Sequence, residues 1–440
     1  MAKTTSKKAR NQVIYSVYVR NHSPEGTFEG VRRDLERIRA LGVDVIWLLP
    51  IHPIGEKNRK GALGSPYAIR DYRAVNPEYG TRAAFQRLVD DIHALGMRCI
   101  IDVVYNHTSP DSWLAEHHPE WFYRKPDGSF GNQMGDWCDV IDLDYSQPGL
   151  WDYQIETLKQ WAAIVDGFRC DVAPLVPLDF WLRARDEVEQ VRPGCLWLAE
   201  SVEPGFITAC RENGKTGLSD SEIFQAFDVS YEYDIFGSFR DYLKGNAPLS
   251  RYAEAVTRQE YTYPRNYVKL RNLENHDNPR AAFIIPEETA LLNWTAFIYF
   301  QKGMTLLYAG QEMCVPHCPS LFDKDTVAWN TGRDWSALLT RLGALKKRPV
   351  LTDARYEVRA LPRDILLASH RSRAGKLLGV FSMRGKSSLV PVDVPDGMYT
   401  NLIDGNSFEV QAGALACTGK PVIFSVITHS VFNKSFLEDF

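Results

Sequence analysis

The chain has 440 residues, more than one average domain, with 45% hydrophobic and 24% charged residues, as in ordinary globular proteins. A net charge of −4 gives no basis for binding nucleic acid or an anionic membrane, and no apolar run is long enough to span a bilayer, so we expect neither partner. Residues 1–10 are polar and basic and no apolar segment follows them, so we expect no signal peptide. The eight cysteines are scattered, which favours free thiols in the cytoplasm.

Apolar runs typical of strands alternate with segments of helical periodicity through most of the chain. Helical patterns cover, for example, residues 28–41, 81–95 and 178–191. Strands at this spacing predict parallel β/α units, and eight of them predict a closed (β/α)8 TIM barrel. The eight strands are expected to start at Val13, Val43, Met97, Gly167, Leu196, Phe227, Tyr267 and Thr305.

Two stretches depart from this alternation. Residues 108–145 are rich in Trp, His, Pro, Gly and Asp without a sustained period, so we interpret them as a short excursion (domain B) after the third strand. From about Tyr356 onward, short strands and turns predict an antiparallel β domain. The expected division is a catalytic barrel of residues 1–107 and 146–349, domain B of 108–145 and a C-terminal β-sandwich of 350–440.

The active site of such a barrel lies at the C-terminal ends of its strands. Arg169 and Asp171 are two residues apart on one predicted strand and therefore point to the same side. That pair alone fits a structural ion pair as well as a site. The polar residues expected at the strand ends are Asp102, Asn106, His107, Arg169, Asp171, Glu200, His276 and Asp277.

This set of residues favours carboxylate chemistry. The sequence contains no Ser-His-Asp elbow, phosphate-binding glycine loop or His-Glu-x-x-His pattern. Two carboxyl groups flanking a glycosidic bond, one as nucleophile and one as acid/base, form the retaining glycosidase arrangement, in which the acid has a raised pKa.

Taken singly, each group also fits a plainer interpretation. The Asp102 to His107 stretch fits a loop cap, Glu200 a solvated strand end and Tyr67 a core residue. We expect Trp113 to be a core residue. Cys314, His317 and Cys318 are interpreted as an ordinary loop rather than a metal site.

Four stretches resemble, in the same order, the four signature regions of the α-amylase superfamily of glycoside hydrolases (family 13 type). They are residues 102–107, 167–171, 198–200 and 273–277. Residues 64–72 and 76–80 resemble the loop that supplies the family's aromatic sugar platform, and residues 142–145 resemble an extra motif of its domain B. The resemblance covers roughly residues 13–345 and implies the family's barrel, with the β tail as its domain C.

The resemblance implies a role for each catalytic residue. Asp171 would be the nucleophile, Glu200 the acid/base, and Asp277 the residue that fixes the sugar's 2- and 3-hydroxyls and stabilises the transition state. Arg169 would keep Asp171 ionised by lowering the pKa of its carboxyl. Asp102 is expected to brace the site without touching substrate.

The resemblance also implies how the substrate is bound. His107 and His276 would donate hydrogen bonds to hydroxyls of one sugar, and Tyr67 would stack under its ring. The chemistry needs no cofactor. A structural calcium ion, if bound, would be held by Asn106 and Asp142 together with a backbone carbonyl near Leu175.

The sequence departs from many α-amylases on the leaving-group side of the site. Pro174 and Leu175 replace a Lys-His pair that reaches toward the leaving-group sugars, and Ser201 follows the acid/base where many relatives have an aromatic residue. We therefore expect a short, intracellular, retaining hydrolase of maltodextrins whose exact specificity the sequence leaves open. The alternatives are a transglycosylase, disaccharide isomerase or phosphorylase with the same triad, or a non-catalytic binding relative, which the complete triad argues against.

Overall fold

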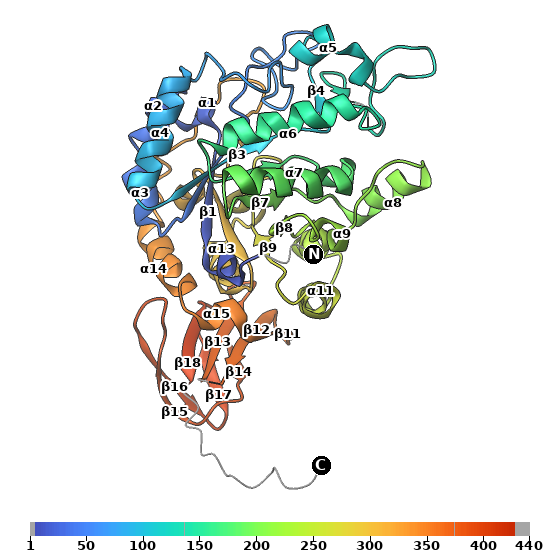
Figure 1. Cartoon of the computed structure of the whole chain (residues 1–440). Coiled ribbons are helices and arrows are strands. Elements are labelled where there is room, and N and C mark those ends of the chain that lie inside the picture. Colours follow the sequence, from blue (N-terminus) through green and yellow to red (C-terminus); the bar gives the residue numbers. More distant parts are fainter. Residues whose placement is uncertain (1–4, 136, 374, 427–440) are drawn as a thin grey trace.

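The computed structural model describes residues 5–135, 137–373 and 375–426, and Figure 1 shows a barrel surrounded by helices with a β layer at one end. The prediction of a (β/α)8 barrel is confirmed by a closed parallel sheet in the order β1-β10-β9-β8-β7-β6-β3-β2. Its strands are β1 (Val13–Val17), β2 (Val45–Leu48), β3 (Arg98–Val103), β6 (Gly167–Cys170), β7 (Leu196–Ala199), β8 (Val229–Tyr231), β9 (Lys269–Arg271) and β10 (Met304–Tyr308).

Helices connect these strands and surround the barrel (Figure 1). The longer ones are α4 (Arg82–Ala94), α6 (Pro148–Ala162), α7 (Leu178–Val191), α8 (Pro204–Glu212), α10 (Tyr233–Leu243), α11 (Leu249–Thr262), α13 (Glu288–Phe300) and α14 (Ser336–Lys346). The shorter ones are α1 (Val19–His22), α2 (Phe28–Arg32), α3 (Leu35–Ala40), α5 (Trp113–His117), α9 (Asp220–Ile223), α12 (Ala281–Ile284) and α15 (Val350–Asp353). Single 3-10 turns occur at η1 (Lys7–Asn11), η2 (Pro119–Trp121), η3 (Ala173–Leu175) and η4 (Gln311–Met313).

The expectation of one continuous helix over residues 28–41 is wrong. The segment forms α2 and α3, which are separated at Asp34, the N-cap residue of α3. The Asp34 carboxylate lies 2.9 Å from His22 and 2.6 Å from Arg37, so this residue is held by ion pairs at the junction. The Asp34 side chain makes no capping hydrogen bond, so its contacts with His22 and Arg37, not a cap, mark the junction.

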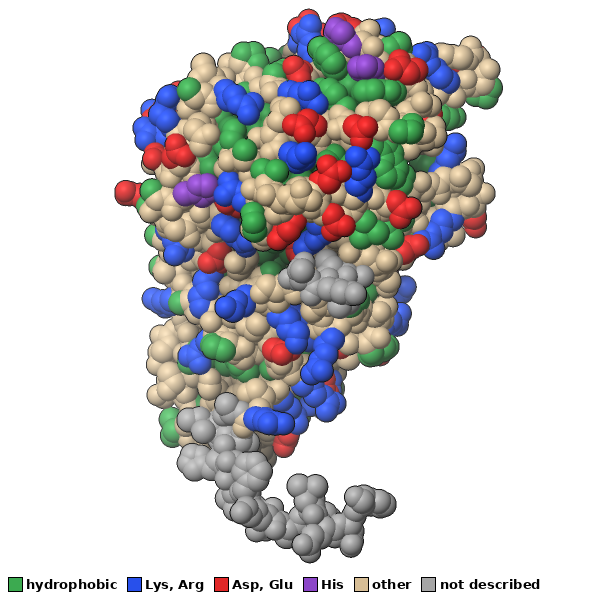
Figure 2. All heavy atoms as spheres, viewed as in Figure 1, with side chains coloured by type: hydrophobic (Ala, Val, Ile, Leu, Met, Phe, Trp, Pro, Cys, Tyr) green, Lys and Arg blue, Asp and Glu red, His purple; other side chains and the backbone are tan. Residues whose placement is uncertain are grey.

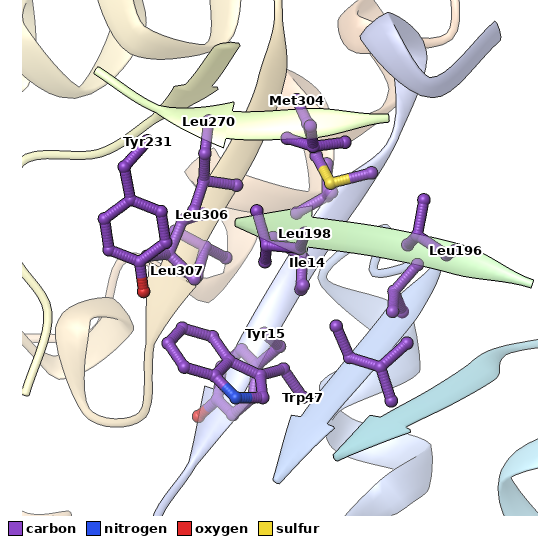
Figure 3. Packing of buried hydrophobic residues seen from close by; sticks show 14 of the residues in the cluster. Ile14, Tyr15, Trp47, Leu196, Leu198, Tyr231, Leu270, Met304, Leu306 and Leu307 are labelled. Atoms are coloured by element: carbon purple, nitrogen blue, oxygen red, sulfur yellow. The ribbon is translucent and has the colours of Figure 1, made fainter. Parts of the chain in front are cut away.

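Apolar residues dominate both faces of β1, β2, β7 and β10 because helices cover the outside and side chains fill the interior. All residues of β1, β2 and β10 are buried. Figure 3 shows buried side chains of different barrel strands packed together, including Ile14, Trp47, Leu198, Leu270 and Met304. This packed interior is a rigid support for polar groups at the strand ends.

The excursion between β3 and α6 contains a small antiparallel pair, β4 (His107–Thr108) with β5 (Ile141–Asp142). The expectation that Trp113 belongs to the core is wrong. Its side chain is 38% exposed and stacks on His117 at 4.3 Å and on Tyr153 at 5.6 Å. In the five-residue helix α5, Leu114 is the buried residue, which leaves Trp113 on the outer face.

Two four-stranded antiparallel sheets form the C-terminal β layer. One has the order β11-β12-β13-β18 and the other β14-β17-β16-β15. Their bounds are β11 (Arg355–Leu361), β12 (Ile365–Ser372), β13 (Gly375–Ser382), β14 (Ser388–Pro391), β15 (Gly397–Thr400), β16 (Ser407–Gln411), β17 (Ala414–Cys417) and β18 (Val422–Val426). The sheets share a core that includes Val380, Val390 and Leu415, as in a sandwich. The expected C-terminal range runs to residue 440, and residues 427–440 lie outside the described part of the chain.

The first of these sheets packs on the barrel. The ring centres of Phe381 of β13 and Phe297 of α13 are 5.2 Å apart, and Asn293 of α13 accepts a hydrogen bond from the Ser382 N–H.

Acidic and basic side chains are interspersed on the face seen in Figure 2. Over the described ranges, none of the helices combines the length and the apolar composition needed to cross a bilayer.

Gly167 tests the packing between β6 and β7. A Cβ atom there would lie 2.3 Å from the Leu196 carbonyl oxygen, so Gly167→Ala should lower the free energy of unfolding by about 1–3 kcal/mol or more. Gly237, within α10, has open space around its Cβ position, and Gly237→Ala should raise the free energy of unfolding by up to about 1 kcal/mol. Urea unfolding of both variants checks this, and equal effects would contradict the packing argument.

Candidate active site

The ends of β3, β6 and β7 place three acidic side chains around one arginine. Asp102 of β3 is paired in register with Arg169 of β6. Beyond the strands the backbone ladder continues, because the Asp171 N–H donates to the Val103 carbonyl at 2.9 Å and the Glu200 N–H donates to the Cys170 carbonyl at 3.0 Å. The positions of Asp171 and Glu200 are therefore fixed by main-chain bonds.

The Arg169 guanidinium is fully buried and contacts all three carboxylates. Its Nη1 donates to Asp102 Oδ1 and to Asp171 Oδ1, both at 2.9 Å. Its Nη2 lies 2.8 Å from Glu200 Oε2, an ion-pair distance, although the pair is not aligned as a hydrogen bond. A guanidinium is rigid and planar. Because Asp171 contacts its Nη1 and Glu200 contacts its Nη2, these two carboxyl groups lie close to each other.

Three aromatic rings enclose the same guanidinium. Its central carbon lies 5.2 Å from the ring centre of Trp47, 5.5 Å from Tyr231 and 5.7 Å from Tyr67. These rings attract the cation through their π faces and exclude water from it. The sequence analysis did not anticipate Trp47 and Tyr231, and the alternation of side chains along β2 and β8 was the available signal.

The two central carboxyls differ in their protonation. Burial raises the pKa of Asp171 to about 6, with further contributions from the Asp102 and Asp277 charges. Burial raises the pKa of Glu200 to about 8. Arg169 lowers the pKa of Asp171, as expected, but desolvation outweighs the attraction of the guanidinium, so the net pKa is raised. Between these values Asp171 is mainly ionised and Glu200 mainly protonated.

A second hydrogen-bonded group joins the ends of β3 and β9. The Tyr67 hydroxyl donates to Asp102 Oδ2 at 3.0 Å and lies 2.6 Å from His276 Nε2. The Tyr67 and His276 rings are stacked, with centroids 5.4 Å apart and 9° between planes. Asp102 thus braces both Arg169 and Tyr67, as the sequence predicts.

His276 is paired with Asp277 across 3.0 Å. Burial lowers the pKa of His276, but the Asp277 carboxylate has the larger combined effect and raises that pKa above its usual value. In return, His276 outweighs burial and holds the pKa of Asp277 below its usual value. The Asp277 side chain is 42% exposed, so an ionised carboxylate is available to a ligand in the mouth.

His107 lies near Asp171 but does not form a hydrogen bond with it. Its Nε2 is 3.9 Å from Asp171 Oδ2, which is too long for a hydrogen bond, and burial lowers the pKa of its imidazole. Trp137 of the excursion lies 5.7 Å from the His107 ring. The sequence analysis missed Trp137 because the excursion has no periodicity from which its position could be predicted.

A backbone group that no side-chain pattern could reveal also reaches the site. The Val172 N–H donates to Glu200 Oε2 at 2.9 Å. Val172 has φ 35° and ψ 44°, a left-handed conformation that is strained for a β-branched residue. The turn after Asp171 is thus held in an unfavourable conformation in which its N–H orients Glu200.

The two side chains expected to take part in a calcium site, Asn106 and Asp142, are neighbours at the edge of the excursion. Asp142 accepts hydrogen bonds from Asn132 Nδ2 at 3.1 Å and from the Gln133 N–H at 2.7 Å, and Asn106 is directed at it through its amide nitrogen. Calcium prefers six to eight oxygen ligands. In residues 5–426, leaving aside 136 and 374, there is no group of three or more His, Cys, Asp or Glu side chains that could hold a metal, and this applies equally to the Cys314–Cys318 loop.

A (β/α)8 barrel with two carboxyls of opposite protonation at its strand ends has the composition of a carboxylate-dependent glycosidase. The sequence profile described as alpha amylase, catalytic domain, matches residues 4–349, and that of the bacterial alpha amylase C-terminal domain matches residues 357–424. The chain belongs to the α-amylase family of glycoside hydrolases.

Solved structures agree with this assignment. An α-amylase from Lactobacillus plantarum is 49% identical, with a TM-score of 0.94 over 96% of this chain and 100% of that one. A maltogenic α-amylase, AmyB from Thermotoga neapolitana, is 31% identical, with a TM-score of 0.85 over 96% of this chain and 99% of that one.

Curated relatives are longer proteins. α-Amylase MalA of Haloarcula japonica is 27% identical over 90% of this chain, and the match spans 59% of that protein. An α-1,4-glucan:maltose-1-phosphate maltosyltransferase of Pseudomonas aeruginosa is 33% identical over 48% of this chain, and the match spans 36% of that protein. The family therefore includes both amylases and transferases among the relatives of this chain.

Removing the shared cation tests the electrostatics of the site. Arg169→Met leaves three buried carboxyls without their cationic partner and should lower the free energy of unfolding by about 3–5 kcal/mol at neutral pH. Without Arg169 the folded-state pKa values of these carboxyls lie further above their unfolded values, so the folded state binds more protons and the loss should grow from pH 5 to pH 8.

Urea unfolding at the two pH values measures this loss. Arg183→Met is the control, because Arg183 forms ion pairs with Asp152 and Glu187 on the surface and should contribute about 1 kcal/mol or less. A loss in Arg169→Met that is independent of pH would contradict the role of the buried charges.

Proposed function

We propose that the protein is a retaining hydrolase of α-1,4-glucosidic bonds in maltooligosaccharides, acting through a covalent glycosyl-enzyme. The observation that carries the proposal is the pairing of Asp171 and Glu200 on one guanidinium, with pKa values of about 6 and about 8. A nucleophile that is ionised beside an acid that is protonated is what a retaining glycosidase requires at neutral pH.

In the first step an oxygen of Asp171 attacks the anomeric carbon while Glu200 gives its proton to the glycosidic oxygen. The bond to the leaving sugar breaks, and the leaving sugar departs with a hydroxyl group. Asp171 is then esterified to the remaining sugar, and Glu200 is ionised. The Val172 N–H and Arg169 contact Glu200 Oε2 and stabilise that anion.

In the second step Glu200 takes a proton from a water molecule whose oxygen attacks the anomeric carbon. The ester to Asp171 breaks and both carboxyls return to their starting states. Asp277, held ionised by His276, would bind sugar hydroxyls and stabilise the positive charge that develops in both steps. Tyr67 and His107 would bind the same sugar.

The relatives support the proposed substrate class, and the cysteines support the proposed compartment. Those similar in sequence include α-amylases, one of them maltogenic. All eight cysteines are free thiols, and six are buried, which suits a reducing compartment. We therefore propose a cytoplasmic enzyme that acts on maltodextrins that have entered the cell.

Transfer is the second candidate, because several relatives are maltosyltransferases that are 30–34% identical over part of the chain. The same glycosyl-enzyme would then react with a sugar hydroxyl or with phosphate instead of water. Product analysis from maltotetraose with and without phosphate distinguishes the two, since transfer yields longer chains or a sugar phosphate.

Replacing the nucleophile tests the proposal directly. Asp171→Asn should lower kcat on maltotetraose by roughly 10⁴-fold or more, because the covalent step is lost. Glu203→Gln, on the surface near the site, should change kcat little, since Glu203 pairs only with the exposed Arg240 among described residues. Near-normal turnover by Asp171→Asn would end the assignment.

The pH profile tests the assignment of acid and nucleophile. The pKa values of the free enzyme predict a bell-shaped kcat/KM with limbs near pH 6, from Asp171, and near pH 8, from Glu200. Activity is lost below the first value as Asp171 gains its proton and above the second as Glu200 loses its proton. Glu200→Gln should lower kcat/KM by roughly 10²–10⁴-fold and remove the alkaline limb. An alkaline limb that persists in this variant would assign the acid elsewhere.

A further inference from the structure

Two loops that follow strands opposite β7 in the barrel are hydrogen-bonded to each other. In the barrel order, β1 lies four places from β7, so β1 and its neighbours β2 and β10 are directly across the mouth from Glu200. The segment after β2 (residues 60–64) and the segment after β10 (residues 320–323) belong to the loops of these strands and are hydrogen-bonded to each other. We call these two segments the glycone wall.

Arg20, which follows β1, donates hydrogen bonds to both segments. Its guanidinium is 1% exposed and donates to the carbonyls of Gly64 at 3.0 Å, Leu63 at 3.3 Å and Leu321 at 3.3 Å. Its remaining donors bind both oxygens of Glu78 at 2.9 Å. A buried guanidinium with this many partners fixes the positions of the two segments relative to each other.

The segments also bond directly to each other. The Leu63 N–H donates to the Phe322 carbonyl at 2.9 Å, and the Ala62 N–H donates to Asp323 Oδ1 at 2.8 Å. Gly61 has φ +63°, and a Cβ atom there would lie 2.6 Å from Phe322 Cβ. The two segments are therefore in close contact, with no room for a chain between them at this point.

Lys60 extends the wall to the excursion. Its Nζ lies 2.8 Å from Asp139 Oδ1 and 6.0 Å from the centre of the Phe322 ring. Asp139 is buried and lies three residues before Asp142, which pairs in register with His107 at the edge of the site. The ion pair thus joins the segment after β2 to the excursion.

The position of Glu200 determines in which direction the substrate chain runs through the site. Glu200 would protonate the glycosidic oxygen, so the leaving sugars lie on the side of β7. In a 1,4-linked chain the glycone continues from O4, which is across the sugar ring from the anomeric carbon. The glycone therefore extends away from Glu200 and toward the glycone wall.

We propose that the glycone wall, sealed by the Lys60–Asp139 ion pair, ends the glycone side of the site, so that the enzyme acts at the non-reducing ends of α-glucan chains. This inference rests on the proposed function and adds to it an exo mode of action. Internal bonds of long chains would be excluded, because the chain beyond the first few sugars on the glycone side has no passage.

The test compares maltoheptaose with maltoheptaose whose terminal 4- and 6-hydroxyls are blocked by an ethylidene group, with products separated by chromatography. The wild-type enzyme should cleave the free substrate with a kcat/KM at least about tenfold higher than that of the blocked one. Its first product from the free substrate should be one short sugar. Equal cleavage of both substrates would overturn the exo mode and leave the proposed function intact. Cleavage of neither would overturn the proposed function itself.

Two variants in one loop then test the seal. Lys60→Ala should lower the free-to-blocked ratio by about two- to fivefold, the scale of one partly exposed ion pair. Lys57→Ala, an exposed lysine of the same loop, should leave the ratio unchanged. An unchanged ratio in Lys60→Ala would remove the ion pair from the proposal.

Discussion

The shared contact of one buried guanidinium with three carboxylates is the constraint on which the site depends. Asp102, Asp171 and Glu200 come from three different strands, and without the charge of Arg169 they would repel one another in a dry environment. One cation does not neutralise three anions, so the buried carboxyls tend to keep protons. Burial is the largest cause of both raised pKa values, and the single guanidinium offsets it only in part.

The barrel makes this concentration of charge possible. Parallel strands bring their ends to one mouth, and the packed interior seen in Figure 3 prevents the strand ends from moving apart. The left-handed turn at Val172 adds local strain beside the site. Strain and partly unpaired buried charge both destabilise the fold, which is typical of sites that are organised for catalysis.

The loops that follow the strands decide what reaches this charged centre. After β6, the segment that follows Asp171 is the short turn η3, which consists of Ala173, Pro174 and Leu175. On the opposite side, Arg20 and Lys60 bind segments that are distant in sequence. The same triad can therefore act on chain ends or on internal bonds, depending on which loops surround it.

The sequence by itself determined the barrel and the order of its strands, because alternating strands and helices with buried apolar runs leave few other topologies. It also placed Asp102, Asp171, Glu200 and Asp277 at strand ends, since those positions are local features of the chain. It did not determine the pKa of Asp171, the exposure of Trp113 or the Lys60–Asp139 pair. These depend on desolvation and on contacts between residues far apart in the chain, which only the tertiary structure brings together.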